Sequence, residues 1–295
     1  GTVLNAGTQT LSVTYTPSSA NYATATATVQ ITVNQATPVI TWANPAAITY
    51  GTALSGTQLN ATATPSGGTF VYSPASGTVL NAGTQTLSVT YTPSNANYVP
   101  QTATVQLVVN KKTLTLKAGD ATRPYNTANP GFSGNLTGAV NGDSFTESFT
   151  TTAVLTSPVG TYPIVPSATG PAIANYTIAA TNGTLTITQA STAASITWAN
   201  PAAITYGTAL STTQLNASST IAGSFAYTPA AGTVLSVGTQ SLSAVFTPSD
   251  PVNYAPQTVT ASLKVGKATP VITWAAPAGI AYGTTLGNTQ LDATA

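Results

Sequence analysis

The stretch "GTVLNAGTQTLSVTYTPS" at residues 1–18 recurs letter for letter at residues 77–94. Within the second copy, apolar and polar residues alternate strictly over 86–92, a pattern typical of a β-strand that buries one face. The residues on the expected inner face are Leu87, Val89 and Tyr91, and the same alternation continues at 102–109. Since β-branched threonine suits the exposed face of such strands, these stretches predict antiparallel sheets.

A second repeated stretch, "ITWANPAAITYGTALS", occurs at 40–55 and at 196–211, with a looser copy, "ITWAAPAGIAYGTTLG", at 272–287. A period of this length indicates a tandem array of small modules. Proline and glycine punctuate every segment, as in all-β sandwiches. Asn-Gly pairs at 141–142 and 182–183 predict tight hairpins.

The repeats divide the chain into five parts. We predict a partial module first, three whole modules, and a partial module last, joined by the short connections 34–38, 110–113, 188–192 and 265–270. The predicted parts are residues 1–34, 35–110, 111–189, 190–265 and 266–295.

The two partial modules match different portions of one whole module. Residues 266–295 align with 34–63, and residues 1–34 align with 77–110. We therefore expect a window from a longer array, and the mass of the natural chain tests this: a chain of 29.4 kDa with these termini would contradict it. The alternative is that the two partial modules complete each other between neighbouring copies.

The composition excludes several kinds of site. The chain of 295 residues has no Cys, His or Met, so disulfides, Cys/His zinc sites, thiol nucleophiles and His-based triads are absent. Only eleven residues are charged, far below the ~25% of an average soluble domain. Residues 1–110 and 148–249 contain no Lys, Arg, Asp or Glu. A basic patch for nucleic acid is missing, and no apolar run approaches the ~20 residues of a membrane span.

One tripeptide unites all the modules. "ANY" occurs at 20–22, 96–98 and 174–176, and "VNY" at 252–254, always before a final alternating strand. We interpret the tyrosines either as tyrosine corners, with a buried ring and a hydroxyl bonded to backbone, or as ordinary core residues at a strand start. The residues are Tyr22, Tyr98, Tyr176 and Tyr254.

The repeated stretches resemble bacterial immunoglobulin-like (Ig-like) repeats that occur in tandem in large secreted and surface proteins. Residues 111–189 resemble the related MBG-type Ig-like domain through "RPY" at 123–125, "NP" at 129–130, "SPVGTYPI" at 157–164 and "ANYTI" at 174–178. Asn126 departs from that pattern, which has Gly, and we expect at most one altered turn. The resemblance implies a tandem array of Ig-like antiparallel β-sandwiches serving as spacers, stalks, adhesin shafts or fibre subunits.

The tryptophans and carboxylates are the candidate ligand-binding residues. Exposed, Trp42, Trp198 and Trp274 would form a row for stacking on glycans; we expect burial instead, because tryptophan is highly buried on average. Paired carboxylates suit glycoside hydrolysis or calcium binding. We expect instead a solvated patch paired with Lys117 and Arg123. The carboxylates are Asp120, Asp143 and Glu147, with Asp250 in the next module.

Covalent modification is also conceivable at a few positions. Lys117 and Lys264 are candidates for internal isopeptide bonds with Asn, but the 35–110 module has no Lys, so such bonds are no general device. We interpret the five Asn-x-Ser/Thr sequons as chance in a threonine-rich chain. They begin at Asn60, Asn135, Asn175, Asn182 and Asn216.

Together these features predict a bacterial extracellular or cell-surface structural protein without catalytic, cofactor or metal residues. It would form a shaft or the subunit of a surface filament, with itself as the main partner, because few charges oppose close approach. The alternative is an adhesin or carbohydrate-binding array that binds cell-surface glycans through the tryptophans. An enzyme is a more distant third.

The uncharged module provides a direct test of this composition. An isolated 35–110 module has no side chain that titrates between about pH 5 and 9, so with its N-terminus acetylated its thermal midpoint should be insensitive to pH in that range and to sodium chloride. Calorimetry at low and high salt measures this. A midpoint that moves by several degrees with sodium chloride would contradict the prediction.

Overall fold

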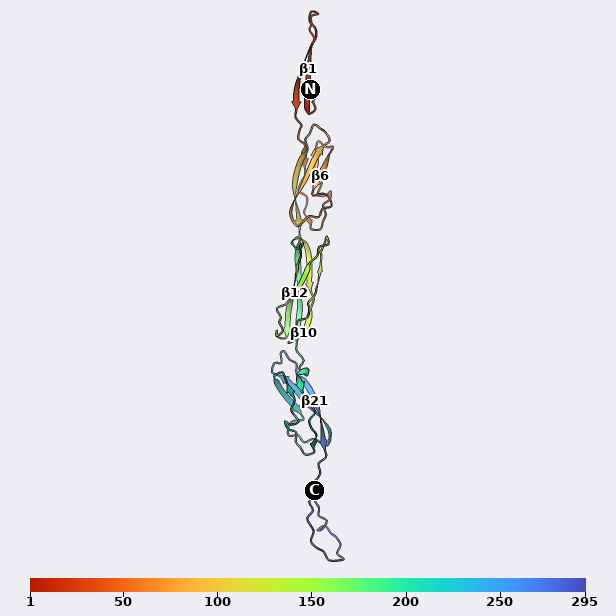
Figure 1. Cartoon of the computed structure of the whole chain (residues 1–295), viewed down its shortest axis with the longest axis vertical. Coiled ribbons are helices and arrows are strands. Elements are labelled where there is room, and N and C mark those ends of the chain that lie inside the picture. Colours follow the sequence, from red (N-terminus) through yellow and green to blue (C-terminus); the bar gives the residue numbers. More distant parts are fainter. The chain divides into compact units, whose positions relative to one another are not determined.

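The computed structural model describes all residues from Gly1 to Ala295 and is almost entirely β-structure (Figure 1). Twenty-one strands and two short 3-10 helices alternate with turns, and the sheets follow one another along the sequence. The prediction of an all-β tandem array of Ig-like sandwiches is confirmed. Neither helix has the length and apolarity that crossing a bilayer requires.

Residues 1–34 form a single antiparallel hairpin. Strand β1 (Gly7–Tyr15) pairs with β2 (Ala25–Val33) in a register that joins Leu11 to Val29. The apolar side chains of this hairpin that alternate along one face are exposed: Leu11, Val13, Tyr15, Val29 and Ile31.

The 35–110 module contains a four-stranded sheet, in the order β4-β8-β7-β6, and a two-stranded sheet, β3-β5. All neighbours are antiparallel except β4 and β8, which are parallel. The strands are β3 (Val39–Thr41), β4 (Ile48–Thr49), β5 (Thr62–Thr64), β6 (Gly68–Ser73), β7 (Gly83–Pro93) and β8 (Gln101–Asn110).

The alternation along β7 and β8 places one row of side chains in the core. Leu87 and Leu107 are fully buried, whereas the threonines between such positions face outward. Burying each large apolar side chain contributes about 1.5–3 kcal/mol. The buried row comprises Leu87, Val89, Tyr91, Val105, Leu107 and Val109.

The 111–189 module has a four-stranded sheet in the order β10-β15-β13-β12 and a three-stranded sheet in the order β11-β9-β14. The elements are β9 (Lys112–Ala118), β10 (Ala121–Pro124), β11 (Gly134–Thr137), β12 (Thr146–Thr150), β13 (Gly160–Thr169), η1 (Ile173–Asn175), β14 (Tyr176–Thr181) and β15 (Gly183–Thr188).

The two hairpins predicted from Asn-Gly pairs are wrong. Residues 141–142 do form a turn, with Asn141 at φ 59°, but this turn connects β11 to β12, which lie in different sheets. Residues 182–183 connect β14 to β15, again in different sheets. The chain crosses from one layer of the sandwich to the other at these points, so the adjoining strands do not pair.

The 190–265 module repeats the arrangement of 35–110. Its sheets are β17-β21-β20-β19 and β16-β18, and residues 266–295 add only an isolated bridge between Thr273 and Thr294. The elements are η2 (Ala193–Ser195), β16 (Ile196–Thr197), β17 (Ile204–Thr205), β18 (Ser218–Ser219), β19 (Gly223–Thr228), β20 (Gly238–Pro248) and β21 (Gln257–Gly266).

Contacts group the chain into two compact units, and the division passes through the 111–189 module. The first unit comprises residues 1–119, 132–150 and 164–183. The second comprises residues 120–131, 151–163 and 184–295.

A glycine at the start of an edge strand allows an aromatic ring to close each core. A Cβ on Gly68 would lie 2.5 Å from Cε2 of Tyr91 and would also clash with the carbonyl oxygen of Thr92. Gly223 has the same relation to Phe246, whose Cε2 would lie 2.5 Å away. The fully buried rings of Tyr91 and Phe246 therefore require glycine opposite them.

Substituting this glycine tests the packing. We expect Gly68→Ala to destabilise the 35–110 module by about 1–3 kcal/mol, because the added methyl forces the Tyr91 ring out of the core. Gly56→Ala is the matched control, since nothing lies within 4 Å of its Cβ position. Chemical denaturation measures both, and equal effects of the two substitutions would contradict the explanation.

Candidate functional site: the junctions between modules

The connections between modules continue the strands. After β2, Ala36 forms a parallel bridge with Tyr98 of the following module, and its N–H donates to the carbonyl of Asn97 over 2.8 Å. Ala190 forms the same bridge with Tyr254 and donates to the carbonyl of Asn253 over 2.9 Å. These connections are therefore paired backbone segments that also begin the next module.

The connection from β8 to β9 follows the same pattern. Only Lys111 separates the two strands, and β9 pairs in parallel with β14, joining Lys112 to Tyr176. At the other two connections a glutamine adds a further contact. The Nε2 of Gln35 donates to the carbonyl of Ala96, and that of Gln189 to the carbonyl of Pro251, both over 2.7 Å.

The asparagine of three of the four Asn-Tyr pairs forms a hydrogen bond to the preceding module, which we call the junction bridge. Its side-chain oxygen accepts from the backbone N–H of the residue just before the glycine that opens a long strand. The N···O distances are 2.7 Å from Ala6 to Asn97, 2.8 Å from Ala82 to Asn175, and 2.9 Å from Val159 to Asn253. Three junctions thus use one contact.

The amide nitrogen of these asparagines makes a second bond that depends on the neighbouring module. Asn97 donates to Oδ1 of Asn5 over 3.0 Å, and Asn175 donates to Oδ1 of Asn81 over 3.1 Å. The corresponding position of the 111–189 module is Pro158, which has no side-chain acceptor. Asn253 donates instead to Oδ2 of Asp250 in its own module, over 2.8 Å.

A pair of tyrosine rings accompanies the bridge at two junctions. The rings of Tyr50 and Tyr176 pack edge to face, with centroids 5.3 Å apart. The rings of Tyr125 and Tyr254 pack in the same way at 5.3 Å. Such pairs contribute about 0.5–1.5 kcal/mol beyond the burial of their area.

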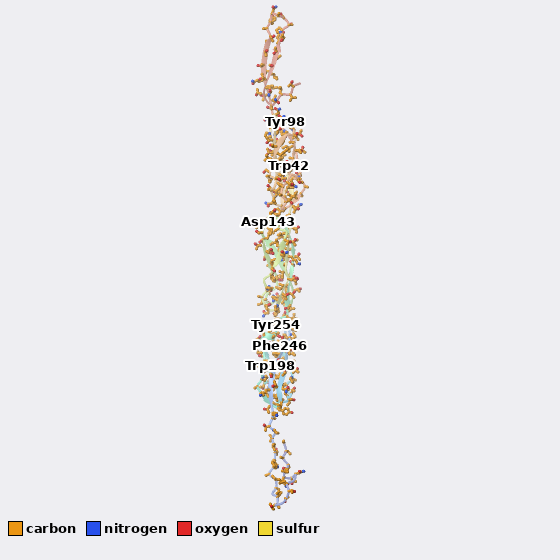
Figure 2. All side chains as sticks on the ribbon, turned by 90° about the vertical axis from the view of Figure 1, so that its right-hand side faces the viewer. Trp42, Tyr98, Asp143, Trp198, Phe246 and Tyr254 are labelled. Carbon is orange, nitrogen blue, oxygen red and sulfur yellow. The ribbon has the colours of Figure 1, made fainter.

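The hydroxyls of Tyr50 and Tyr176 share one acceptor, the carboxylate of Asp143, which is labelled in Figure 2. Oδ2 of Asp143 accepts from the hydroxyl of Tyr50 over 3.0 Å and from the hydroxyl of Tyr176 over 2.7 Å. A single hydrophobic cluster includes Leu107 of the 35–110 module and Leu114 of the next, as well as both tyrosines. The core is therefore continuous across this junction.

Burial and the hydrogen bond to Asp143 raise the pKa of Tyr176 above the ordinary tyrosine value of 10.0, with burial as the larger cause. Burial likewise raises the pKa of Tyr227, which lies in the 190–265 module. Both effects favour the neutral phenol in the folded state.

The structure corrects the tyrosine-corner interpretation. Tyr176 is buried, its hydroxyl accepts from the N–H of Val140 over 3.0 Å, and it alone has the predicted backbone contact. Tyr22 is largely exposed. Tyr98 and Tyr254 are half-buried, because each lies at the end of a module beside its junction. The asparagine before Tyr98, Tyr176 and Tyr254 makes the repeated contact, and its recurrence in the tripeptide is the signal that the sequence analysis did not use.

Two of the three tryptophans lie inside their modules. Trp42 and Trp198 are half-buried, and each donates its indole N–H over 3.1 Å to a backbone carbonyl, of Gln58 and Gln214 respectively (Figure 2). Trp42 packs edge to face on Tyr72 with centroids 5.4 Å apart. Trp274 alone is exposed. The three indoles thus form no equivalent row of exposed rings.

The predicted patch of paired charges is wrong. Arg123 is buried, and its guanidinium donates to Oδ1 of Asn129 over 2.7 Å and to the carbonyls of Val154 and Pro124 over 2.6 and 3.1 Å. Neutral oxygens that converge inside the module solvate this charge. Asp120 accepts from the N–H of Thr184 over 2.7 Å, so it also stabilises the backbone.

The remaining candidate residues are dispersed. Lys117 lies opposite Asn135 on adjacent strands, but both side chains are exposed, and Lys264 is exposed as well. Of the sequon asparagines, Asn175 is buried in its junction bridge, whereas Asn60, Asn182 and Asn216 are exposed. No three His, Cys, Asp or Glu side chains lie together in a group that suits a metal ion.

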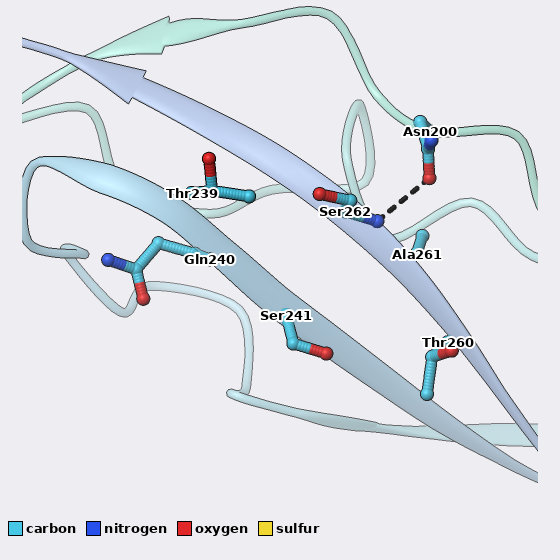
Figure 3. Close-up of a pocket in the computed structure, with 7 residues that line it drawn as sticks. All are labelled: Asn200, Thr239, Gln240, Ser241, Thr260, Ala261 and Ser262. Atoms are coloured by element: carbon cyan, nitrogen blue, oxygen red, sulfur yellow. Dashed lines mark hydrogen bonds between the residues drawn. The ribbon is translucent and has the colours of Figure 1, made fainter.

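The polar side chains that line a shallow pocket on the 190–265 module carry hydroxyl and amide groups, and Ala261 adds an apolar methyl (Figure 3). Oδ1 of Asn200 accepts from the backbone N–H of Ser262 over 2.8 Å. Asn44 forms the equivalent bond to Gln106 over 3.0 Å in the 35–110 module. Each asparagine thus accepts a hydrogen bond from a backbone N–H of the last long strand of its module. The pocket is lined by no ionisable side chain that could perform acid–base chemistry.

Comparison with known families identifies the family of one module. Residues 114–186 match the MBG domain (YGX type), in agreement with the resemblance of residues 111–189. Asn126, which replaces the expected glycine, has φ 58°, in the same left-handed region as Gly51 at φ 95° and Gly207 at φ 96°. Asparagine tolerates that conformation better than most residues. The chain is a tandem Ig-like repeat protein that contains one MBG domain.

Comparison with solved structures found matches of low identity. Sidekick-1 immunoglobulin domains 1–5 match with 12% identity and a TM-score of 0.27, over 78% of this chain and 59% of that one. The protocadherin gammaB7 EC3-6 cis-dimer structure matches with 10% identity and a TM-score of 0.26, over 79% and 74%. A Bacteroides ovatus mixed-linkage glucan utilization locus protein, SGBP-B, in complex with a heptasaccharide, matches with 13% identity and a TM-score of 0.19, over 87% and 77%.

At these identities and TM-scores none of the three structures bears on function. The chain spans less than two thirds of the Sidekick-1 structure. The search among proteins with curated functions found no match.

Removing a junction bridge should weaken one junction selectively. We expect Asn175→Ala to destabilise the junction by about 1–3 kcal/mol, because it leaves the N–H of Ala82 without its partner. Asn135→Ala is the matched control, since that side chain is exposed in the same module. Hydrogen exchange of the Ala82 amide measures the effect, and equal protection in the two variants would contradict it.

The raised pKa of Tyr176 predicts alkaline sensitivity. A raised pKa contributes stability that is fully present below pH 10.0, the unfolded value, and is lost as the pH rises through the folded pKa. The unfolding temperature of the parent should therefore decrease when the pH is raised above about 10. The variant Tyr176→Phe should unfold at a lower temperature than the parent at neutral pH, but its unfolding temperature should decrease less as the pH rises. An identical pH slope in parent and variant would contradict this prediction.

Proposed function

We propose that this chain is a non-enzymatic structural segment of a bacterial cell-surface or extracellular protein, acting as a shaft or as the subunit of a surface filament. The observation that carries the proposal is the junction bridge, which recurs at three of the four connections between modules with N···O distances of 2.7–2.9 Å. A protein that acts as a spacer or bears force needs a similar contact at each junction, so that every junction resists bending.

Three kinds of contact restrain the two junctions on either side of the MBG module. The backbone continues as a paired strand, the asparagine bridges to the preceding module, and aromatic rings pack between the modules. Short connections with several contacts limit bending far more than flexible linkers do. This arrangement supports a semi-rigid shaft.

The scarcity of charged residues on the edge strands supports the association of such shafts with one another. Lysine on edge strands is a common defence against edge-to-edge pairing. The edge strands β6 and β19 contain no charged residue, whereas the corresponding strand β12 of the MBG module contains Glu147. The extracellular, bacterial location rests on the resemblance to surface Ig-like repeats and belongs to the proposal.

Distance measurements across one junction test the mechanical role. Because the chain has no cysteine, spin labels can be attached at Thr90→Cys and Ser148→Cys, two exposed positions on either side of a junction. We expect a narrow distance distribution in the parent and a broader one in Asn175→Ala, with Asn135→Ala unchanged. A broad distribution in the parent would contradict the shaft.

The alternative function, a glycan-binding adhesin array, makes a different prediction. Binding of cell-surface glycans through the tryptophans would require exposed indoles, and Trp42 and Trp198 are engaged inside their modules. A glycan array probed with the whole chain separates the two functions. Saturable binding that is lost on Trp42→Ala, while the fold is retained, would favour the adhesin.

A further inference from the structure

Strand β6 leaves one side of its sheet open within a complete module. It is the last strand in the order β4-β8-β7-β6, and β7 is its only partner in that sheet (Figure 1). A groove of about 430 Å³ lies beside it, and the larger side chains that line this groove are Leu59, Phe70, Val71 and Tyr72. The free side of β6 is therefore accessible to an incoming strand.

The hydrogen bonding between β6 and β7 shows which backbone groups of β6 are free. The N–H of Ser94 donates to the carbonyl of Gly67 over 3.2 Å, so these two residues form a hydrogen-bonded antiparallel pair. Such pairs alternate with non-hydrogen-bonded pairs along a ladder. The N–H and C=O of Val71 therefore face β7, whereas those of Phe70 and Tyr72 point to the open side of the sheet.

The side chains of β6 suit pairing with an identical strand. Val71, on the outer face, is 66% exposed between the hydroxyl side chains of Thr69 and Ser73. A charged residue at such a position would bring like charges together in a pair of identical strands, and β6 has none. The edge strand β12 of the MBG module differs, because it carries the exposed Glu147.

The 190–265 module has the same free edge on β19, the last strand of the order β17-β21-β20-β19. The N–H of Ser249 donates to the carbonyl of Ala222 over 2.9 Å, which by the same alternation leaves the backbone groups of Phe225 and Tyr227 free. The exposed residue between them is Ala226. Both whole Ig-like modules outside the MBG domain thus present an uncharged edge with one pattern of free groups.

We propose that β6 pairs antiparallel with β6 of a second copy of this chain, with Val71 of the two copies opposite each other. In this register the N–H and C=O of Phe70 meet those of Tyr72 in the second copy, and the reverse, so the edge is complementary to itself. The two valines form a non-hydrogen-bonded pair with Cα atoms about 4.5 Å apart, and each covers the other. The contact is isologous, since both copies use the same surface.

Strand β19 offers the same antiparallel pairing to β19 of a second copy, with Ala226 in place of Val71. The smaller side chain buries less apolar surface, so we expect β6 to contribute more to association than β19.

This inference rests on the proposed function and deepens it by naming the surface through which copies associate. Sedimentation of the full 1–295 chain over a range of concentrations tests it. The weight-average mass should rise above the monomer value of 29.4 kDa as the concentration increases. A monomer at every concentration would overturn the pairing.

Matched double variants identify the edges as the interface. Val71→Lys with Ala226→Lys places like charges opposite each other in both strand pairs and should raise the dissociation constant more than about tenfold. Val108→Lys with Val245→Lys adds the same charge at exposed positions of the central strands β8 and β20 and should associate like the parent. Because all these positions are exposed, neither variant should unfold the modules. Equal association of the two double variants would overturn the proposal.

Disulfide trapping tests the register. The chain has no cysteine, so Val71→Cys introduces a single thiol. In the proposed register the two thiols lie on opposing residues whose Cα separation of about 4.5 Å suits a disulfide. Oxidation should therefore link Val71→Cys into a covalent dimer, whereas Val108→Cys should stay largely unlinked. Equal cross-linking of the two variants would overturn the register.

The spin-label distances at Thr90 and Ser148, measured on dilute chain, separate this proposal from the shaft itself. A chain that stays monomeric at high concentration but has a narrow distance distribution would overturn only the pairing of edges. A broad distribution would overturn the shaft.

Discussion

The hydrogen bond from a backbone N–H of one module to an asparagine side chain of the next is the contact on which the array depends. The donor belongs to the backbone, so its position is fixed by the turn before a long strand and not by the identity of the side chain. Ala82 and Val159 consequently serve equally well. Two different kinds of module can therefore follow each other through one contact, and the paired strand and the tyrosine rings add to it.

Much of the fold could be predicted from the sequence because the governing patterns are local or repeated. The alternation around Leu87 and Leu107 gives the buried face directly, and exact repeats give the modular organisation. The hairpins predicted from the Asn-Gly pairs were wrong because a turn sequence does not determine whether the strands on either side of it belong to the same sheet. Arg123 misled because a charge is usually exposed, and only the three-dimensional structure shows neutral oxygens from Asn129 and Val154 converging on it.

The junction itself lay beyond sequence reasoning for a related reason. Tyr176 and Tyr98 share the tripeptide Ala-Asn-Tyr, yet Tyr176 is buried and Tyr98 is half-buried. Tyr176 packs on Tyr50 of the preceding module, a contact to which no local pattern points. The asparagine beside them was visible as a recurrence, but its partner lies 91–94 residues away in the chain, where no local pattern points to it.

The interchangeable junction has a consequence for how the chain folds as it is synthesised. The 35–110 and 190–265 modules share the identical stretch 40–55 and 196–211, and repeat proteins are prone to domain swapping and to misassembly between domains. The MBG module stands between them in sequence, with its own strand order and its own buried arginine. Because it fits the same junction on both sides, a dissimilar domain can separate two similar ones without interrupting the array. The MBG module thus keeps the 35–110 and 190–265 modules apart, whereas residues 1–34 and 266–295 each adjoin a module of their own type.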